Sequence, residues 1–229
     1  MISKLMLFLA LAAAAQAGTP VVLELFTSEG CASCPPADEL FAKLVEEPDV
    51  IGLAYHVDYW NKLGWTDPFS KADWSRRQGR YSGAFESSEI YTPQLIAGGR
   101  KECVGSDEDK ARAAIADARQ AAHPARVKLT VQKPAAGKLA ATASFDISGK
   151  VEGDPAVALV LFEDGLEVDV KAGENAGSKL AHQRVVRALV EGTSAEFALE
   201  PAWKVERLGV VALVQDAKLR VLGAALARP

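Results

Sequence analysis

The chain has 229 residues, of which 49% are hydrophobic and 24% are charged, and its formal net charge is −4 at pH 7. This apolar content excludes an intrinsically disordered protein, and a mildly acidic chain without a basic stripe of interleaved aromatic residues is not expected to bind nucleic acid. Three cysteines are too few for a small disulfide-stapled scaffold, and one of them must stay outside any pair.

Residues 1–17 have the pattern of a signal peptide. Lys4 is followed by an unbroken apolar run from Leu5 to Ala15, and Ala15-Gln16-Ala17 fits cleavage between small residues. The run has about half of the roughly 20 apolar residues that span a bilayer, and no second such segment follows. We therefore expect a periplasmic or secreted protein that begins at Gly18 and has no membrane span.

Residues 18–124 alternate between predicted strands and helices. Strands are expected at Val21–Thr27, Val50–Val57, Pro93–Ala97 and Arg100–Val104, and helices at Pro35–Val45, Ser70–Tyr81 and Ser106–Ala122. The first β–α–β unit should be right-handed with parallel strands. Gly98-Gly99 predicts a tight turn between the last two strands, and Ser106 is the expected N-cap of the last helix.

Residues 125–229 change to short alternating runs. Strands are expected at Val127–Val131, Leu139–Phe145, Ala156–Phe162, Val185–Leu189, Ala195–Leu199, Leu208–Val214 and Leu219–Leu226, separated by glycine-rich turns. Several short strands separated by such turns are typical of a β-sandwich. The acidic, glycine-rich stretch from Glu163 to Gly177 is expected to be a solvated connector, with a functional loop as the alternative. The boundary between the two predicted domains lies near residue 124.

A Cys-x-x-Cys pair, Cys31 and Cys34, lies between the first strand and the first helix. A thiolate at a helix N-terminus faces unpaired N–H groups, which lower its pKa. We expect an exposed Cys31 to attack and Cys34 to resolve the mixed disulfide. Pro35 disfavours the helical conformation for Cys34, so the helix end could favour Cys34 at least as much. The remaining cysteine, Cys103, is expected to be a buried spectator.

Tyr91-Thr92-Pro93-Gln94 precedes the third predicted strand. Strand and helix order up to residue 124 is that of thioredoxin-like proteins, which place a cis-proline here, packed against the cysteine pair. We therefore expect a cis Thr92–Pro93 bond, although cis bonds are only about 5–6% of X–Pro bonds. Thr92 would offer backbone hydrogen bonds to a substrate.

Three further groups are candidate site residues. Glu24, on the first strand, would accept a proton from Cys34 if it were buried beside it; the alternatives are a Glu at the solvent-facing end of the strand, or one paired with a helix residue. Tyr59 and Trp60 follow the second strand and are candidates to contact a substrate, whereas core packing is the commoner use of such residues. His56 is a candidate base or metal ligand, with a hydrogen-bonded structural role as the alternative.

The combined motifs identify a resemblance to a family. They are Leu23 to Cys31, Pro35 to Asp38, His56 to Trp60, Leu63 to Trp65, Asp67 to Phe69, Arg77-Gln78, Tyr91 to Gln94, Gly173 to Gly177, His182 and Val185 to Arg187. They resemble an uncharacterised family of exported bacterial thioredoxin-like proteins, a domain of unknown function with a C-terminal β-domain. The resemblance implies an α/β thioredoxin-like domain followed by an all-β, sandwich-like domain.

Three functions follow from these patterns. The first is a cell-envelope thiol–disulfide oxidoreductase that uses Cys31 and Cys34, without a cofactor, on exported proteins or small thiols. The second is a non-catalytic binding module in which the same pair is a structural disulfide. The third is a Cu(I)-handling protein in which His56 joins the two thiolates.

Overall fold

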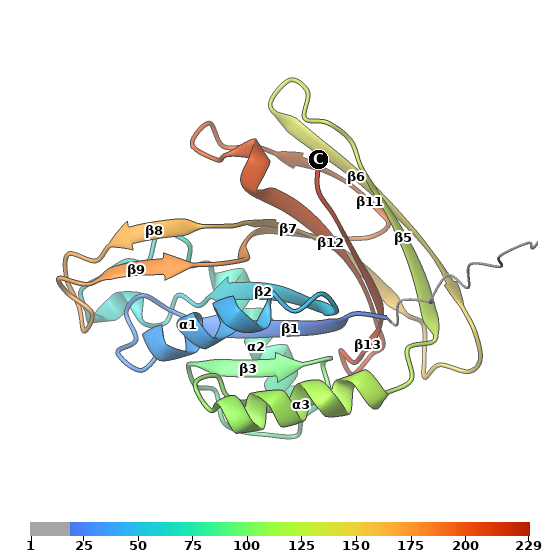
Figure 1. Cartoon of the computed structure of the whole chain (residues 1–229), viewed down its shortest axis with the longest axis horizontal. Coiled ribbons are helices and arrows are strands. Elements are labelled where there is room, and N and C mark those ends of the chain that lie inside the picture. The colour runs from blue at the N-terminus through green and yellow to red at the C-terminus, as the bar shows by residue number, and fades with distance from the viewer. Residues whose placement is uncertain (1–18) are drawn as a thin grey trace, which may run out of the picture.

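A mixed eight-stranded sheet forms the centre of the computed structural model, which describes residues 19–229 (Figure 1). Its strands are β1 (Val21–Thr27), β2 (Val50–His56), β3 (Gln94–Ala97), β4 (Lys101–Val104), β7 (Ala156–Glu163), β10 (Val185–Glu191), β12 (Leu208–Gln215) and β13 (Val221–Ala227). They lie in the order β13-β12-β7-β10-β2-β1-β3-β4. The predicted signal peptide and its cleavage site lie outside the described residues.

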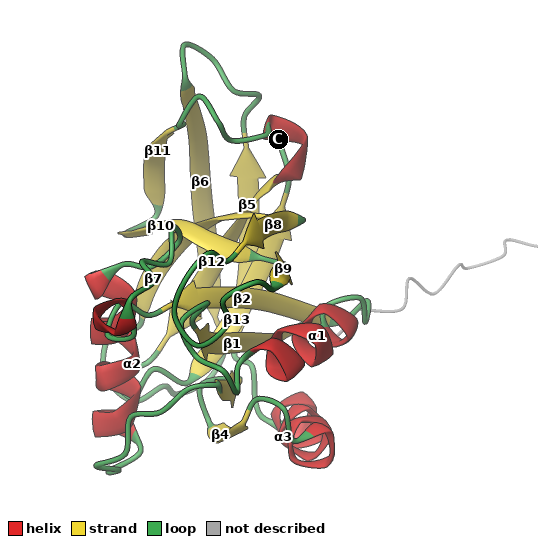
Figure 2. Ribbon diagram, turned by 90° about the vertical axis from the view of Figure 1, so that its left-hand side faces the viewer, coloured by secondary structure: helices red, strands yellow, loops and turns green. Residues whose placement is uncertain are grey.

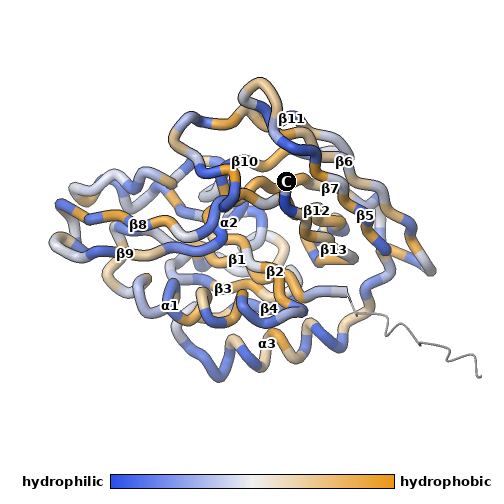
Figure 3. The backbone as a smooth tube through the Cα atoms, turned by 45° about the horizontal axis from the view of Figure 1, so that its top comes forward, coloured by the Kyte–Doolittle hydropathy of each residue, from blue (hydrophilic) through white to orange (hydrophobic). Residues whose placement is uncertain are grey.

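Three helices cover the two faces of this sheet (Figure 2). The helices α1 (Pro35–Leu44) and α3 (Glu108–Gln120) lie on one face, and α2 (Ala72–Ala84) lies on the other. Leu23 and Leu25 of β1 pack toward α1 and α3, whereas Phe26 packs toward α2. The strand is therefore buried along its whole length, and Figure 3 shows hydrophobic residues concentrated along the central strands.

The helices begin close to their predicted starts, but with different caps. Asp107, not Ser106, caps α3, and its carboxylate accepts a hydrogen bond from the Lys110 N–H at 3.1 Å. The carboxylate is a strong N-cap acceptor, so the helix begins one residue later than the serine suggests. The helix α2 begins at Ala72 and continues to Ala84, three residues beyond the predicted end at Tyr81.

The predicted division into an α/β thioredoxin-like domain and a separate all-β sandwich-like domain is wrong. The strand β10 pairs in parallel with β2, with Val185 opposite Ala54, and the Ala54 N–H donates to the Arg184 carbonyl at 2.9 Å. One sheet thus contains strands from both sides of residue 124. Without β10, the edge of β2 would expose unpaired backbone groups beside an apolar surface, which is unfavourable.

Hydrophobic packing joins the same two parts of the chain. One continuous cluster on the α2 face contains Phe26 and Tyr55 from the first half and Phe162 and Leu213 from the second. The turn between β3 and β4 also accepts a hydrogen bond from β13, since the Val221 N–H donates to the Gly98 carbonyl at 2.9 Å.

Two small sheets complete the fold. The strands β5 (Ala125–Val131), β6 (Lys138–Ile147) and β11 (Ser194–Ala198) form a three-stranded sheet in the order β11-β6-β5. It packs on the central sheet through residues such as Leu139 and Leu161. The strands β8 (Leu166–Asp169) and β9 (Lys179–His182) form a hairpin near α1, where a connector was expected (Figure 1). Across residues 19–229, no helix is both long and apolar enough to span a membrane.

Candidate functional site

Cys31 and Cys34 form a disulfide where the loop after β1 meets the N-terminus of α1. Their Cα atoms are 5.4 Å apart, and Cys34 is the N-cap residue, followed by Pro35 at the first helical position. Both cysteines have 0% exposed surface. The expectation of an exposed Cys31 is therefore wrong. The loop between β8 and β9 contacts the backbone of the cysteine loop, since the Asn175 side chain donates to the Cys31 carbonyl at 2.9 Å.

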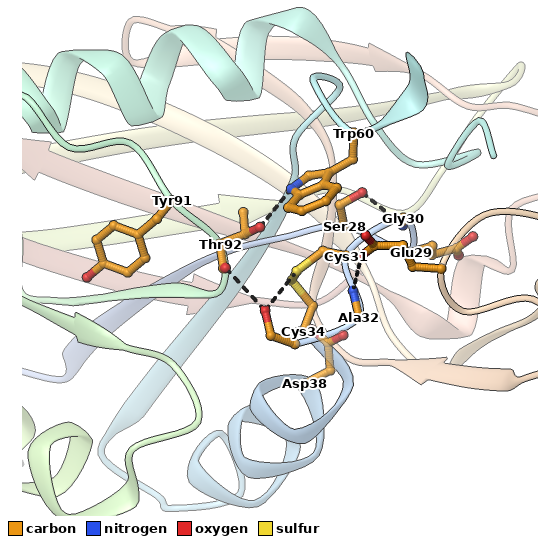
Figure 4. Close-up of a disulfide and its surroundings, with 12 residues drawn as sticks. Ser28, Glu29, Gly30, Cys31, Ala32, Cys34, Asp38, Trp60, Tyr91 and Thr92 are labelled. Carbon is orange, nitrogen blue, oxygen red and sulfur yellow. Dashed lines mark hydrogen bonds between the residues drawn. A yellow bond between two sulfur atoms is a disulfide. The ribbon is translucent and has the colours of Figure 1, made fainter. Parts of the chain in front are cut away.

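The Thr92–Pro93 peptide bond lies beside this disulfide and is cis, as expected. The Ser33 hydroxyl lies between the two segments, 3.3 Å from the Cys31 sulfur and 3.5 Å from the Thr92 carbonyl oxygen. The Trp60 indole N–H donates to the Thr92 hydroxyl at 2.8 Å (Figure 4). Cys31, Cys34, Thr92, Pro93 and Trp60 thus form one site, assembled from three separate segments of the chain.

Glu24 does not belong to this site. Its side chain faces α2, on the opposite side of the sheet from α1, and accepts hydrogen bonds from Arg77 Nε at 2.5 Å and Arg77 Nη2 at 2.9 Å. Tyr81 also donates to the Glu24 carboxylate. The alternative interpretation, a glutamate paired with a helix residue, describes the contacts, and Glu24 has no route to the proton of Cys34.

Tyr59 links the site to α2. Its hydroxyl donates to the Gln78 side chain of α2 at 3.2 Å, and Gln78 in turn donates to the Tyr91 carbonyl at 2.7 Å. Tyr59 therefore supports the segment that leads to the cis peptide, and because its hydroxyl also interacts with the Thr92 side chain, both candidates contact the site.

A buried group of ionisable residues lies behind the disulfide, and its assembly was not predicted. His182 of β9 lies between two acids, with Nε2 3.2 Å from Glu29 Oε1 and Nδ1 3.8 Å from Asp38 Oδ2. The three residues are 9% exposed or less. Asp38 is in the first turn of α1, where its N–H donates to the Cys34 carbonyl at 3.1 Å, and Figure 4 shows its side chain close to Cys34.

Burial raises the pKa of Asp38 to about 6, although His182 and the Thr27 hydroxyl act in the opposite direction. The carboxyl group therefore exchanges its proton near neutral pH. Residues of this kind are common in catalytic sites. The only signal in the sequence was helical spacing, which places Asp38 one turn after Cys34; nothing in the sequence brings the distant His182 to it.

His56 belongs to the same buried region, but it is held by another acid. Its Nδ1 lies 2.7 Å from Asp67 Oδ2, and this histidine together with the N–H groups of Glu29 and Phe69 lowers the pKa of Asp67 against the effect of burial. The contacts fit the hydrogen-bonded structural role for His56. Within residues 19–229, no group of three or more potential ligands has the geometry of a metal site.

Cys103 is buried, as expected, and is not bonded to another cysteine. It lies in the cluster with α1 and α3. Burial, together with the negative charges of Asp107 and Glu102, raises the pKa of the Cys103 thiol to about 11. A thiol with such a pKa is a poor nucleophile at neutral pH.

Comparison with known proteins gives relatives of the whole fold. A family described as a protein of unknown function, DUF1223, matches residues 22–215. The crystal structure of a protein from Agrobacterium tumefaciens is 30% identical with a TM-score of 0.65, over 93% of this chain and 96% of that one. HBP35 of Porphyromonas gingivalis is 20% identical with a TM-score of 0.66, over 92% of this chain and 75% of that one, and shares the fold. No curated protein matches the chain.

Proposed function

The chain belongs to the DUF1223 family of proteins of unknown function, and we propose that it is a thiol–disulfide oxidoreductase of the cell envelope. Its substrates would be exported proteins or small thiols, and export would depend on the signal peptide predicted for residues 1–17. The proposal rests on one observation above all: a Cys-x-x-Cys disulfide lies at a helix N-terminus directly beside a cis-proline peptide.

The position of the pair gives each sulfur a different task. The positive end of α1 stabilises a thiolate that forms on reduction. Cys31 lies in the loop next to Thr92, where a substrate would approach, whereas Cys34 starts the helix above Asp38. Cys31 would therefore carry the mixed disulfide, and Cys34 would resolve it.

The exchange can be written for oxidation of a substrate dithiol. A substrate thiolate attacks the Cys31 sulfur, the Cys31–Cys34 bond breaks, and Cys34 leaves as a thiolate that takes a proton from Asp38. The second substrate thiolate then attacks the substrate sulfur that is bonded to Cys31. The substrate disulfide forms, and Cys31 leaves as a thiolate. The substrate has become a disulfide and the protein a dithiol, and substrate reduction is the same sequence in reverse.

Trapping of mixed disulfides tests this assignment. Because Cys34→Ser removes the resolving thiol, this variant should accumulate mixed disulfides through Cys31 with exported cysteine proteins, and Cys31→Ser should accumulate few. The midpoint potential of the pair should lie in the range of thiol oxidoreductases, about −120 to −270 mV. Trapping by Cys31→Ser instead would reverse the two roles, which the N-cap position of Cys34 would explain.

A non-catalytic binding module with a structural disulfide is the second candidate, and complete burial of both cysteines favours it. Structural disulfides have potentials below about −300 mV. A potential in that range, with no mixed disulfide in either variant, would contradict the oxidoreductase and establish the structural role.

A further inference from the structure

The disulfide is buried although the residues between its cysteines are not. Ala32 and Ser33 are exposed, whereas Cys31 and Cys34 have no exposed surface. A thiol can react with a disulfide only along the S–S axis of an accessible sulfur. Some part of the protein must therefore move before Cys31 can be attacked.

The segment that holds the cysteine loop in this buried conformation consists of residues 171–178, the tip of the β8–β9 hairpin, which we call the lid. Asn175 is 9% exposed within a run of exposed neighbours. Its amide group donates to the Glu29 carbonyl at 2.8 Å and to the Cys31 carbonyl at 2.9 Å. One side chain of the lid thus satisfies two backbone acceptors on either side of Gly30.

A second lid residue satisfies a donor of the same loop. The Ala32 N–H donates to the Glu174 carboxylate at 3.0 Å. This bond fixes the backbone of the residue that directly follows Cys31. The closed lid therefore fixes the backbone of the loop in which Cys31 is buried.

The lid can move without disrupting the hairpin that carries it. Gly173 and Gly177 both have positive φ angles, 75° and 86°, at the two ends of the tip. The tip is closed on itself by a hydrogen bond from the Gly177 N–H to the Val170 carbonyl at 2.9 Å. Its polar contacts with the cysteine loop are those of Glu174 and Asn175, so opening breaks few interactions.

We infer that the lid selects extended polypeptide segments as substrates and disfavours small thiols, with Asn175 as the residue that sets this preference. Opening leaves the Glu29 carbonyl and the Ala32 N–H without these partners and the Cys31 carbonyl with the Cys34 N–H alone, which is costly in a partly buried loop. An extended peptide backbone offers both N–H donors and C=O acceptors and replaces the lid contacts, as in β-strand addition. A small thiol replaces none of them. This inference rests on the proposed function.

Reduction of the Cys31–Cys34 disulfide by two probes tests the inference. Dithiothreitol is the small dithiol, and a ten-residue peptide with a central Cys-x-x-Cys pair is the extended one; each is oxidised to a disulfide as the protein gains two thiols, counted by alkylation and mass. Asn175→Ala should raise the dithiothreitol rate about tenfold, equivalent to about 1.4 kcal/mol. The peptide rate should change much less, because the peptide supplies its own hydrogen bonds.

Two further variants keep the test decisive. Ser178→Ala is the matched control, since its side chain is exposed on the same tip, and both rates should stay at the wild-type value. Glu174→Ala changes an exposed residue and should raise the dithiothreitol rate, by less than Asn175→Ala; it decides the question if Asn175→Ala does not fold.

An unchanged dithiothreitol rate would refute the lid, and equal acceleration with both probes would refute selection of peptides. Acceleration by Ser178→Ala as large as that of Asn175→Ala would show general loosening of the hairpin instead. Failure of the oxidoreductase proposal is distinguishable, because Cys34→Ser would then capture no substrate even though Asn175→Ala speeds chemical reduction.

Discussion

Asp38 gives the site a pH dependence that stability measurements can detect. Its pKa is raised from 3.8 to about 6 by burial, and its other ionisable neighbours are His182, Asp67 and Glu29. Because the folded state holds the proton more tightly than the unfolded state, the contribution of Asp38 is fully present below pH 4 and is lost as the pH rises through 6. Over this interval, the free energy of unfolding should fall by up to about 3 kcal/mol relative to Asp38→Asn.

Urea denaturation of wild type and Asp38→Asn at intervals from pH 4 to pH 8 measures this difference. Glu39→Gln is the matched control, since Glu39 is the exposed neighbour on the same helix, and its difference from wild type should not show this fall. Parallel pH curves for wild type and Asp38→Asn would mean that Asp38 titrates as an ordinary surface carboxylate and does not supply the proton for Cys34.

Local sequence rules located the cysteine pair and the cis-proline, but not Asp38, the acid proposed to exchange a proton with Cys34. Alternation along β1 places Glu24 and Phe26 on one face and Leu25 on the other, which is what the contacts show. It does not state which face meets α1. Asp38 was within reach of helical spacing from Cys34, whereas His182 comes from a hairpin 144 residues after Asp38 and no local pattern connects them.

The turn between β3 and β4 is the element that ties the first half of the chain to the second. Gly99 has a φ of 64°, and a methyl group added there would lie 2.0 Å from the Leu219 carbonyl oxygen. Gly99→Ala should therefore destabilise the protein by more than the roughly 1–2 kcal/mol of a left-handed non-glycine residue, because the turn must also move away from the Leu219 and Arg220 backbone that leads into β13. Thermal unfolding measures the loss.

Gly137 provides the control for this substitution. It has a similar φ of 72°, but no atom lies near the added methyl group. Gly137→Ala should show the conformational cost alone, and the excess for Gly99→Ala then reports the contact between the two halves. Equal losses for the two variants would show that the turn yields to the methyl group and that this contact contributes little.

Elements with a strong periodic pattern were predicted, and the weakly patterned ones were not. The long apolar strands β7 and β12 and the amphipathic helix α3 match their predicted positions within a few residues. The strands β8 and β9 have four residues each, too few to show an alternation among acidic and glycine residues. Their pairing depends on contact with α1 and with the cysteine loop, and no local pattern shows such contacts. The sequence therefore predicts a connector here instead of a hairpin.

At the scale of the molecule, the strands of the central sheet were predictable but their order was not. Alternation identifies a strand and its faces, whereas its neighbours are set by pairing across long separations. The parallel contact of β2 with β10 joins residues 131 positions apart, Ala54 and Val185. The change to short alternating runs near residue 124 is therefore a change in local sequence pattern. The eight-stranded sheet contains strands from both sides of this position.

A single sheet with a continuous core predicts a single unfolding unit. Strands β1 and β12 lie in different halves of the chain, yet both contribute to the eight-stranded sheet and to the cluster on the α2 face. Their amides should exchange with solvent hydrogen with one common free energy, equal to that of global unfolding, because neither strand can be exposed without breaking the shared core. Mass spectrometry of peptides from the two strands, at increasing urea, measures both values.

Exchange from β12 at a lower free energy than from β1 would mean that the second half opens by itself, in which case Gly99→Ala should weaken only one of the two strands. We expect the opposite: because the turn at Gly99 touches β13 directly, its substitution should lower the two values equally.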